Sequence, residues 1–262
     1  MPDTVLLDID DSVATITLNR PDSLNAIDHV LAKDLREAAL EAEMNSQVRC
    51  LVVRGSGPAF MAGGDIRAFK ERVGNNLDRY MADVTHDLHD AIMAFRRMPK
   101  PVVASVHGAA AGAGFSLAMS CDMVIATEDA IFTLAYSVIG ASPDGSSTYS
   151  LPRLVGYHRA MELMLLSDRF GAEKAQELGL INFVVPKDKL KAETEKLATR
   201  LSKGPTFAFG RAKALLGQSL ERGIGDQLDA EAQNIMECSR TADFAEGIDA
   251  FLNKRKPTFV GR

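Results

Sequence analysis

The first 186 residues carry apolar runs of strand length that alternate with stretches of helical periodicity. Two short apolar runs flank a polar turn at Asp10–Ser12, which predicts a pair of strands. Asp28 then precedes apolar residues at helical spacing and is suited to be an N-cap. A polar helix is predicted over residues 77–98, where two prolines follow, and buried strands are predicted at 50–55, 101–108, within 122–134 and at 179–186. Alternating strands and helices predict an α/β fold.

The pattern changes after about residue 187. Strand signals disappear, and helical stretches continue to Phe251 with breaks at Gly204–Pro205 and Gly223–Gly225. We therefore expect two parts: a core over residues 1–186, and a helical C-terminal segment over residues 187–262.

Composition and charge narrow the class of protein. A net charge of −5 without a basic run argues against binding to nucleic acid or to a membrane surface. The most apolar stretch, residues 101–126, is interrupted by His107, glycines and Asp122, so it predicts buried core and not a membrane span. Three widely spaced cysteines without a CxxC pair, behind an acidic N-terminus, predict a cytoplasmic protein. No ligand-spaced His, Asp or Glu cluster suggests a metal site.

Two glycine-rich junctions are the candidates for chemistry, FMAGGDI at Phe60–Ile66 and GAAAGAGFS at Gly108–Ser116. Each follows a predicted strand and leads toward a helical segment; residues 109–120 are predicted to start a helix. Glycine allows a ligand to approach main-chain N–H groups, and a helix N-terminus leaves such groups unpaired. Two donors directed at one point would form an oxyanion hole, worth roughly 3 kcal/mol per donor. Such junctions also serve plain packing, so the motifs alone leave a ligand role open.

Four segments in order resemble the crotonase (enoyl-CoA hydratase/isomerase) superfamily over essentially the whole chain: LNRPDSLNAI, FMAGGDI, PKPVVASVHGAAAGAGFSLAMSCDMVIAT and EGIDAFLNKRKPTF. The resemblance implies a crotonase-like spiral of ββα units with a helical C-terminal trimerisation segment. It also implies an acyl-CoA thioester substrate, with coenzyme A as part of the substrate and no separate cofactor. A homotrimer or a dimer of trimers is the expected assembly.

The resemblance also assigns binding residues. The main-chain N–H groups of Gly64 and Ala113 match the donors that hold the thioester oxygen. Most relatives have glycine where Ala113 stands, and alanine preserves the donor if the backbone there does not need a positive φ. Phe251 and Lys254 match terminal positions that can reach the CoA of a neighbouring subunit. Further positions matching contacts to the CoA substrate are Leu24, Ala62, Asp65, Ile66 and Arg67.

The expected reaction follows from one departure from the family pattern. Ser116 and Tyr136 stand where the hydratases of the family have two glutamates, and neither side chain is a carboxylate base at neutral pH. Both are expected to line the substrate pocket. Asp144 matches the aspartate of several isomerase branches, although Pro-Asp-Gly is also a strong turn signal. We therefore expect an isomerase of the Δ3-Δ2-enoyl-CoA or ring-epoxyphenylacetyl-CoA type, in which Asp144 shuttles a proton.

Three alternatives remain open: an enoyl-CoA hydratase-like lyase, a 4-chlorobenzoyl-CoA dehalogenase-like hydrolase, and a non-catalytic acyl-CoA-binding protein. His89 matches a histidine with which the dehalogenase activates water. That enzyme has a tryptophan at the position of Tyr136, and this sequence contains no tryptophan. An RNA-binding role is disfavoured by the acidic balance and by the lack of a basic, aromatic patch.

Overall fold

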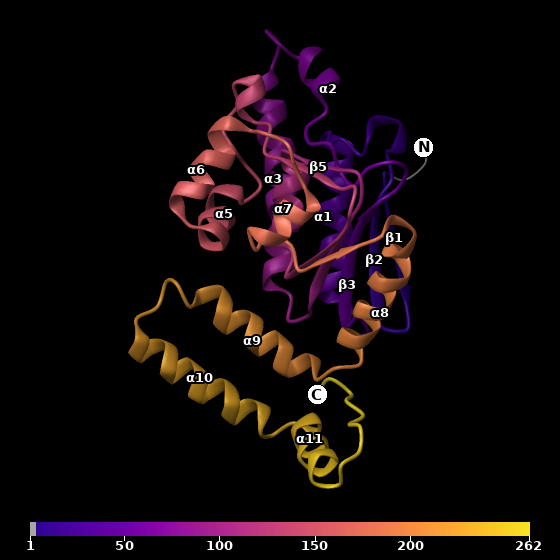
Figure 1. The fold of residues 1–262 in the computed structure, drawn as a ribbon, viewed down its shortest axis with the longest axis vertical. Coiled ribbons are helices and arrows are strands. Elements are labelled where there is room, and N and C mark those ends of the chain that lie inside the picture. The colour runs from indigo at the N-terminus through magenta and orange to yellow at the C-terminus, as the bar shows by residue number, and fades with distance from the viewer. Residues whose placement is uncertain (1–3) are drawn as a thin grey trace.

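Six strands form the central sheet of the protein, which a computed structural model describes over residues 4–262 (Figure 1). In spatial order they are β1 (Val5–Asp10), β2 (Val13–Leu18), β3 (Cys50–Gly55), β4 (Val102–Val106), β6 (Met123–Thr127) and β9 (Phe183–Val185). Only the β1–β2 pair is antiparallel within this described sheet. A second sheet has the order β5 (Ala109–Ala111), β7 (Ile131–Thr133) and β8 (Phe170–Gly171). The predicted mixed α/β fold is confirmed.

Helices cover both faces of the central sheet. On one face, α1 (His29–Met44) and α3 (Leu77–Arg97) pack against each other and share the main apolar core with Leu51 and Val53 of β3. On the other face, α8 (Leu190–Ser202) covers Cys50 and Val52 of the same strand. Because side chains alternate along a strand, a strand buried on both faces reads as a continuous apolar run. This explains why the sequence of residues 50–55 predicts a buried strand.

The short strand β5 corrects one sequence-based prediction. Residues 109–120 were expected to start a helix, but the helix α4 spans only Ala113–Ser120 and the three alanines before it pair in parallel with β7. The backbone of Gly112 has φ of 49°, which ends the strand and begins the helix. Pairing with β7 therefore overrides the helical preference of alanine.

Four further helices are described in the core. They are α2 (Ile66–Lys70), α5 (Ser147–Val155), α6 (Tyr157–Leu166) and α7 (Ala172–Glu177), with short 3-10 turns at Pro21–Ser23, Ser137–Ile139 and Lys187–Lys189. The predicted N-cap is confirmed, because the side chain of Asp28 accepts a hydrogen bond from the N–H of Leu31 at 2.9 Å.

Three C-terminal helices, α9 (Thr206–Gln218), α10 (Ile224–Cys238) and α11 (Ala242–Leu252), form a lobe below the core in Figure 1. The helix α8 packs on the sheet although it falls within the helical segment expected from residue 187. Lys213 of α9 ties the lobe to the core through the carbonyls of Phe95 and Lys100 and the carboxylate of Asp122. Within the described chain, no helix combines the length and apolar character needed to cross a membrane.

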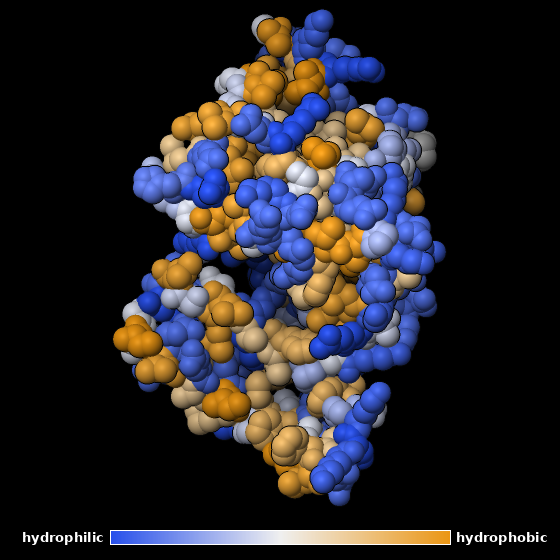
Figure 2. Space-filling view, viewed as in Figure 1, coloured by the Kyte–Doolittle hydropathy of each residue, from blue (hydrophilic) through white to orange (hydrophobic). Residues whose placement is uncertain are grey.

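Large apolar side chains of this lobe are exposed, as the orange atoms over α9–α11 in Figure 2 show. None of the residues of α10 is fully buried. The exposed side chains are those of Leu216, Leu220, Ile224, Leu228, Ile235, Met236, Phe244, Ile248, Phe251 and Leu252. The lobe therefore exposes more apolar surface than is usual for a protein that is soluble as a monomer.

Candidate active site

The two glycine-rich junctions meet through their main chains. The N–H of Met61 donates to the carbonyl of Ala109 at 3.0 Å, and the carbonyl of Met61 accepts from the N–H of Ala111 at 3.0 Å. Gly63 lies so close to the other junction that a Cβ there would be 3.1 Å from the carbonyl oxygen of Ala111. We call residues 61–66 the first donor turn and residues 109–114 the second donor turn. Their contact places Gly64 and Ala113 on adjoining turns.

Both expected donors have unpaired N–H groups. Ala113 is the first residue of α4, so its N–H has no acceptor within the helix and lies at the positive end of the helix dipole. Among the described residues, none accepts a hydrogen bond from the N–H of Gly64. Ala113 is absent from the described residues with positive φ, so alanine keeps the donor without backbone strain. A Cβ on Gly64 would lie 2.6 Å from the ring of Phe69, so any side chain there would have to displace that ring.

Residues 24–27 hold the first donor turn in place. Three main-chain hydrogen bonds join the two segments: from Ala62 to Leu24 at 3.0 Å, from Ile27 to Gly63 at 2.7 Å and from Asp65 to Ile27 at 2.9 Å. Asn25 is fully buried, and its backbone has a positive φ of 56°. Its side-chain amide donates to the carbonyls of Ser56, Ala59 and Phe60. Asn25 therefore connects residues 24–27 to residues 56–60, the stretch of chain that leads into the first donor turn.

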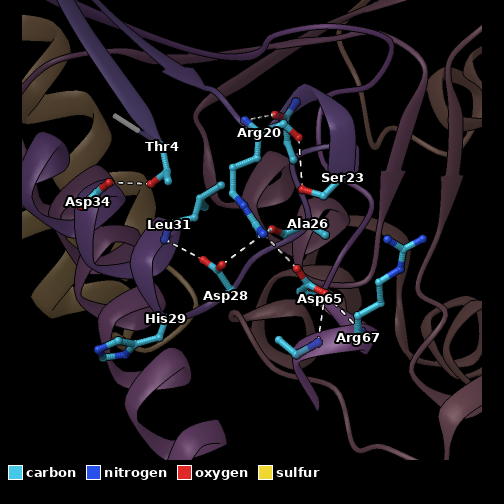
Figure 3. A network of polar contacts seen from close by, with 12 residues as sticks. Thr4, Arg20, Ser23, Ala26, Asp28, His29, Leu31, Asp34, Asp65 and Arg67 are labelled. Carbon is cyan, nitrogen blue, oxygen red and sulfur yellow. Dashed lines mark hydrogen bonds and ion pairs between the residues drawn. The ribbon is translucent and has the colours of Figure 1, made fainter. Parts of the chain in front are cut away.

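Arg20 bridges the caps of two helices, as Figure 3 shows. Its guanidinium lies 3.1 Å from the carboxylate of Asp28, the cap of α1, and 3.0 Å from that of Asp65. Asp65 in turn accepts hydrogen bonds from the N–H groups of Arg67 and Ala68 and so caps α2. Burial alone would raise the pKa of Asp65, but the hydrogen bonds from Ala68 and Arg20 and the charge of Arg20 outweigh it, and its pKa is lowered.

The positions matched to CoA contacts gather around one cavity of about 840 Å³, whereas Ser116 and Tyr136 are buried and line neither this cavity nor the one at Asp144. Leu24, Ile66 and Arg67 line it with exposed side chains, and Asp65 lines it while its carboxylate is occupied by the α2 cap and Arg20. Ala62 lies beside it through its hydrogen bond to Leu24. On the α3 side, the guanidinium of Arg72 stacks 4.1 Å above the ring of Tyr80. Both residues line the same cavity, which adds a cationic, aromatic wall to it.

Asp144, Tyr136 and Ser116 meet in one hydrogen-bonded group. The hydroxyl of Tyr136 donates to Oδ1 of Asp144 at 2.6 Å, and Oγ of Ser116 lies 2.9 Å from the same hydroxyl. Gly145, with φ of 57°, packs against Ser116, where a Cβ would come within 2.7 Å of the serine Cβ. Burial and the neighbouring charge of Asp144 raise the pKa of Tyr136, so its hydroxyl stays protonated and acts as a donor.

His89 lies on α3 across from the same turn. Its Nε2 accepts a hydrogen bond from the N–H of Gly145 at 3.2 Å, so the neutral ring carries its proton on Nδ1. Asp144 and His89 both line a cavity of about 740 Å³ between α3 and residues 141–148. Asp144 is the single carboxylate among the described residues that line this cavity. The arrangement supplies one carboxylate, half-buried, beside a space large enough for an acyl group, and His86 also lines this space.

Two expected contacts lie apart from this group within one chain. Phe251 is 84% exposed on α11 and lines an apolar groove of the C-terminal lobe, and Lys254 is exposed just beyond that helix. Sequence reasoning did not single out Arg20 or Asn25 as functional residues. The signal was present in the motif LNRPDSLNAI, where both are polar positions beside buried apolar ones. In the described chain, no group of three or more His, Cys, Asp or Glu side chains could hold a metal ion.

Comparison with known proteins shows similarity along the whole chain. A sequence model of the enoyl-CoA hydratase/isomerase family matches residues 8–262. The 1,2-epoxyphenylacetyl-CoA isomerase of Escherichia coli is 36% identical over 263 residues, covering 100% of both chains. A probable enoyl-CoA hydratase of Rhodobacter capsulatus is 38% identical and covers 99% of this chain and 98% of its own. The crystal structure of an enoyl-CoA hydratase from Polaromonas superimposes with a TM-score of 0.92 at 33% identity, over 97% of this chain and 99% of that one.

Proposed function

Because the chain belongs to the enoyl-CoA hydratase/isomerase family, that is, to the crotonase superfamily, we propose that it is an acyl-CoA isomerase. Its relatives include both an isomerase and a probable hydratase, so the specific reaction rests on the site. One observation carries the proposal. The carboxylate of Asp144 is the sole acid among the described residues lining its cavity, and the positions of the two glutamates expected of a hydratase hold hydroxyl groups.

The proposed reaction moves a double bond through an enolate. The thioester oxygen accepts hydrogen bonds from the N–H groups of Gly64 and Ala113, each worth roughly 3 kcal/mol in the transition state. Asp144 removes a proton from the α-carbon, and the electron pair of the broken C–H bond moves onto the thioester oxygen. The enolate then collapses while Asp144 returns the proton to the γ-carbon. A Δ3-enoyl-CoA thus becomes a Δ2-enoyl-CoA with no atom gained or lost.

Hydration by two acids, as in the hydratases of the family, would require a second carboxylate, and the described residues that line the cavity include none. The raised pKa of Tyr136 keeps its hydroxyl protonated, and the hydroxyl proton is donated to Asp144. Ser116 is fully buried behind Tyr136. These contacts favour the isomerase over the hydratase-like alternative, and the ring-epoxide isomerase named among the relatives would use the same donors and acid.

Dehalogenation is disfavoured by the contact of His89. A histidine that activates water must accept a proton on a ring nitrogen whose lone pair is free. The lone pair of Nε2 in His89 accepts the N–H of Gly145, and Nδ1 carries the proton of the neutral ring. The non-catalytic alternative is disfavoured by the half-buried carboxylate of Asp144, which simple binding does not require. Tyr136 and Ser116 connect this carboxylate to α4, the helix that begins with the unpaired N–H of Ala113.

The substrate and the assembly form part of the same proposal. We propose that the CoA moiety occupies the cavity at Leu24, Ile66 and Arg67, without a separate cofactor. We also propose that the chain forms a homotrimer or a dimer of trimers, because the exposed apolar side chains of α9–α11 need a protein partner. Phe251 and Lys254 would then approach the CoA site of a neighbouring subunit.

The test uses a Δ3-enoyl-CoA that carries two deuterium atoms at the α-carbon. We expect the wild-type protein to form a Δ2 product with one α-deuterium removed, and Asp144→Asn to slow this by about 10²- to 10⁴-fold. Asp129→Asn is the matched control, since Asp129 pairs with Lys187 on the surface. Undiminished turnover by Asp144→Asn would exclude this role for Asp144. A substrate recovered with both deuterium atoms would support a binding protein, and chloride release from an aryl-CoA would support a dehalogenase.

A further inference from the structure

We infer that Tyr136 is a positioning residue that fixes Oδ1 of Asp144 and thereby makes Oδ2 the oxygen that carries the substrate proton. The inference rests on the proposed function, because it describes how Asp144 performs the isomerisation. It starts from the 2.6 Å hydrogen bond between Tyr136 and Asp144, which the resemblance to the family did not predict.

The direction of the hydrogen bonds follows from counting protons. Tyr136 has one hydroxyl proton, and a carboxylate can only accept, so this proton belongs to the bond with Asp144. Ser116 must then be the donor in its 2.9 Å contact with the oxygen of Tyr136. The other acceptors near Ser116, the carbonyls of Gly112 and Asp144, are both 3.2 Å away. The chain therefore runs from Ser116 to Tyr136 to Asp144.

The main chain around Asp144 is held by contacts separate from Tyr136. The carbonyl of Asp144 accepts from both the N–H and the hydroxyl of Ser147, and the next N–H, that of Gly145, donates to His89. What remains free is rotation of the carboxyl group, whose torsion is broad and roughly two-fold. The Tyr136 hydroxyl is the contact that stops this rotation. Because Tyr136 is 8% exposed and Ser116 is fully buried, bulk water competes little for these bonds.

Fixing the carboxyl group has a consequence for the path of the proton. When Oδ2 takes the α-proton, Tyr136 can continue to donate to Oδ1 of the neutral acid. The new O–H bond then stays on the substrate side and returns the same proton to the γ-carbon, so little of it is lost to water. A carboxyl group free to rotate would exchange its proton with solvent between the two steps.

The experiment follows the removed deuterium in Tyr136→Phe, with Tyr149→Phe as the matched control because the Tyr149 hydroxyl binds Glu221 outside the site. For wild type and control, we expect most of the removed deuterium at the γ-carbon of the product. For Tyr136→Phe, we expect that fraction to fall at least about two-fold, and kcat to fall about 10- to 100-fold with little change in KM, because a hydrogen bond to a charged group is lost.

The outcomes separate this inference from the proposed function. If Asp144→Asn is inactive while Tyr136→Phe keeps the transferred fraction and the kcat of wild type, the inference is overturned and the isomerase assignment stands. If Asp144→Asn is fully active, both are wrong. Should Tyr136→Phe fail to fold, Ser116→Ala replaces it. That variant keeps the Tyr136 hydroxyl but removes the donor behind it, so the transferred fraction should fall by a smaller amount, and an unchanged fraction would overturn the inference.

Discussion

The two donor turns present the same kind of group, an unpaired N–H, but are held in different ways. The first donor turn depends on charged and polar side chains, since Arg20 binds Asp65 and Asn25 joins the neighbouring segments. The second depends on the lack of side chains. Gly112 adopts a positive φ, and a Cβ on Gly114 would lie 2.1 Å from the carbonyl oxygen of Met61.

This difference identifies the interactions that hold each N–H donor in place. An ionic contact is lost when one partner is removed or protonated. Close packing of two main chains is disrupted when a single methyl group is added between them. We therefore expect substitutions in the second donor turn to act mainly on folding, and substitutions around the first to act on both stability and catalysis.

The largest effect is expected from Gly114→Ala. The added methyl group must move Met61 and separate the two turns, at an expected cost of about 3 kcal/mol or more in unfolding free energy. Urea unfolding followed by circular dichroism measures this. Gly217→Ala is the control, because its Cβ meets nothing within 4 Å and alanine favours the helix interior. Equal stability of the two variants would contradict packing as the force that holds the second turn.

A smaller loss is expected from Arg20→Met, which leaves the carboxylates of Asp28 and Asp65 without their shared cation. Both side chains are partly exposed, so we expect a loss of about 1–3 kcal/mol in unfolding free energy together with a lower kcat/KM. Arg159→Met, which breaks an exposed pair with Glu162, should change neither measurably. If Arg20→Met loses stability but keeps full kcat/KM, the bridge does not position the donor.

The third prediction concerns pH. Since the pKa of Asp65 is lower in the folded protein than in the unfolded chain, its contribution is complete above the unfolded value and is lost as pH falls through the folded value. The stability difference between wild type and Asp65→Asn should therefore shrink as pH is lowered below about 4. Urea midpoints at a series of pH values test this, and a difference that grows toward acid would show the opposite sign.

The smallest effect is expected from Ala113→Gly. The N–H donor is retained and the backbone needs no positive φ, so only the methyl contact and some chain stiffness are lost. We expect kcat/KM to stay within about five-fold of wild type, measured with the same Δ3-enoyl-CoA. A much larger loss would mean that the methyl group itself shapes the substrate pocket.

Much of the fold could be predicted because its signals are local. The buried strand at residues 50–55 and the cap at Asp28 are visible in neighbouring residues. The strand β5 could not be predicted, because its three alanines resemble a helix and become a strand only beside β7. Predicting such a strand requires knowledge of its partner in space.

The candidate site could likewise be predicted only in part. Gly64, Ala113 and Asp144 follow from motifs, but the contacts that orient them join distant segments of the chain. Arg20 lies 45 positions before Asp65. The bond between Tyr136 and Asp144 depends on the direction in which packing points a phenol ring. Residue types alone therefore indicate the candidate chemistry and leave its alignment undetermined.

The main chain of Met61 contacts the second donor turn through both its N–H and its carbonyl. The amide hydrogens of Met61 and Ala111 should therefore exchange with solvent deuterium through one shared opening event, at matching rates. A substrate that binds to both donor turns should slow both exchange rates equally. The two donors would thus act as a single mechanical unit, displaced together or not at all.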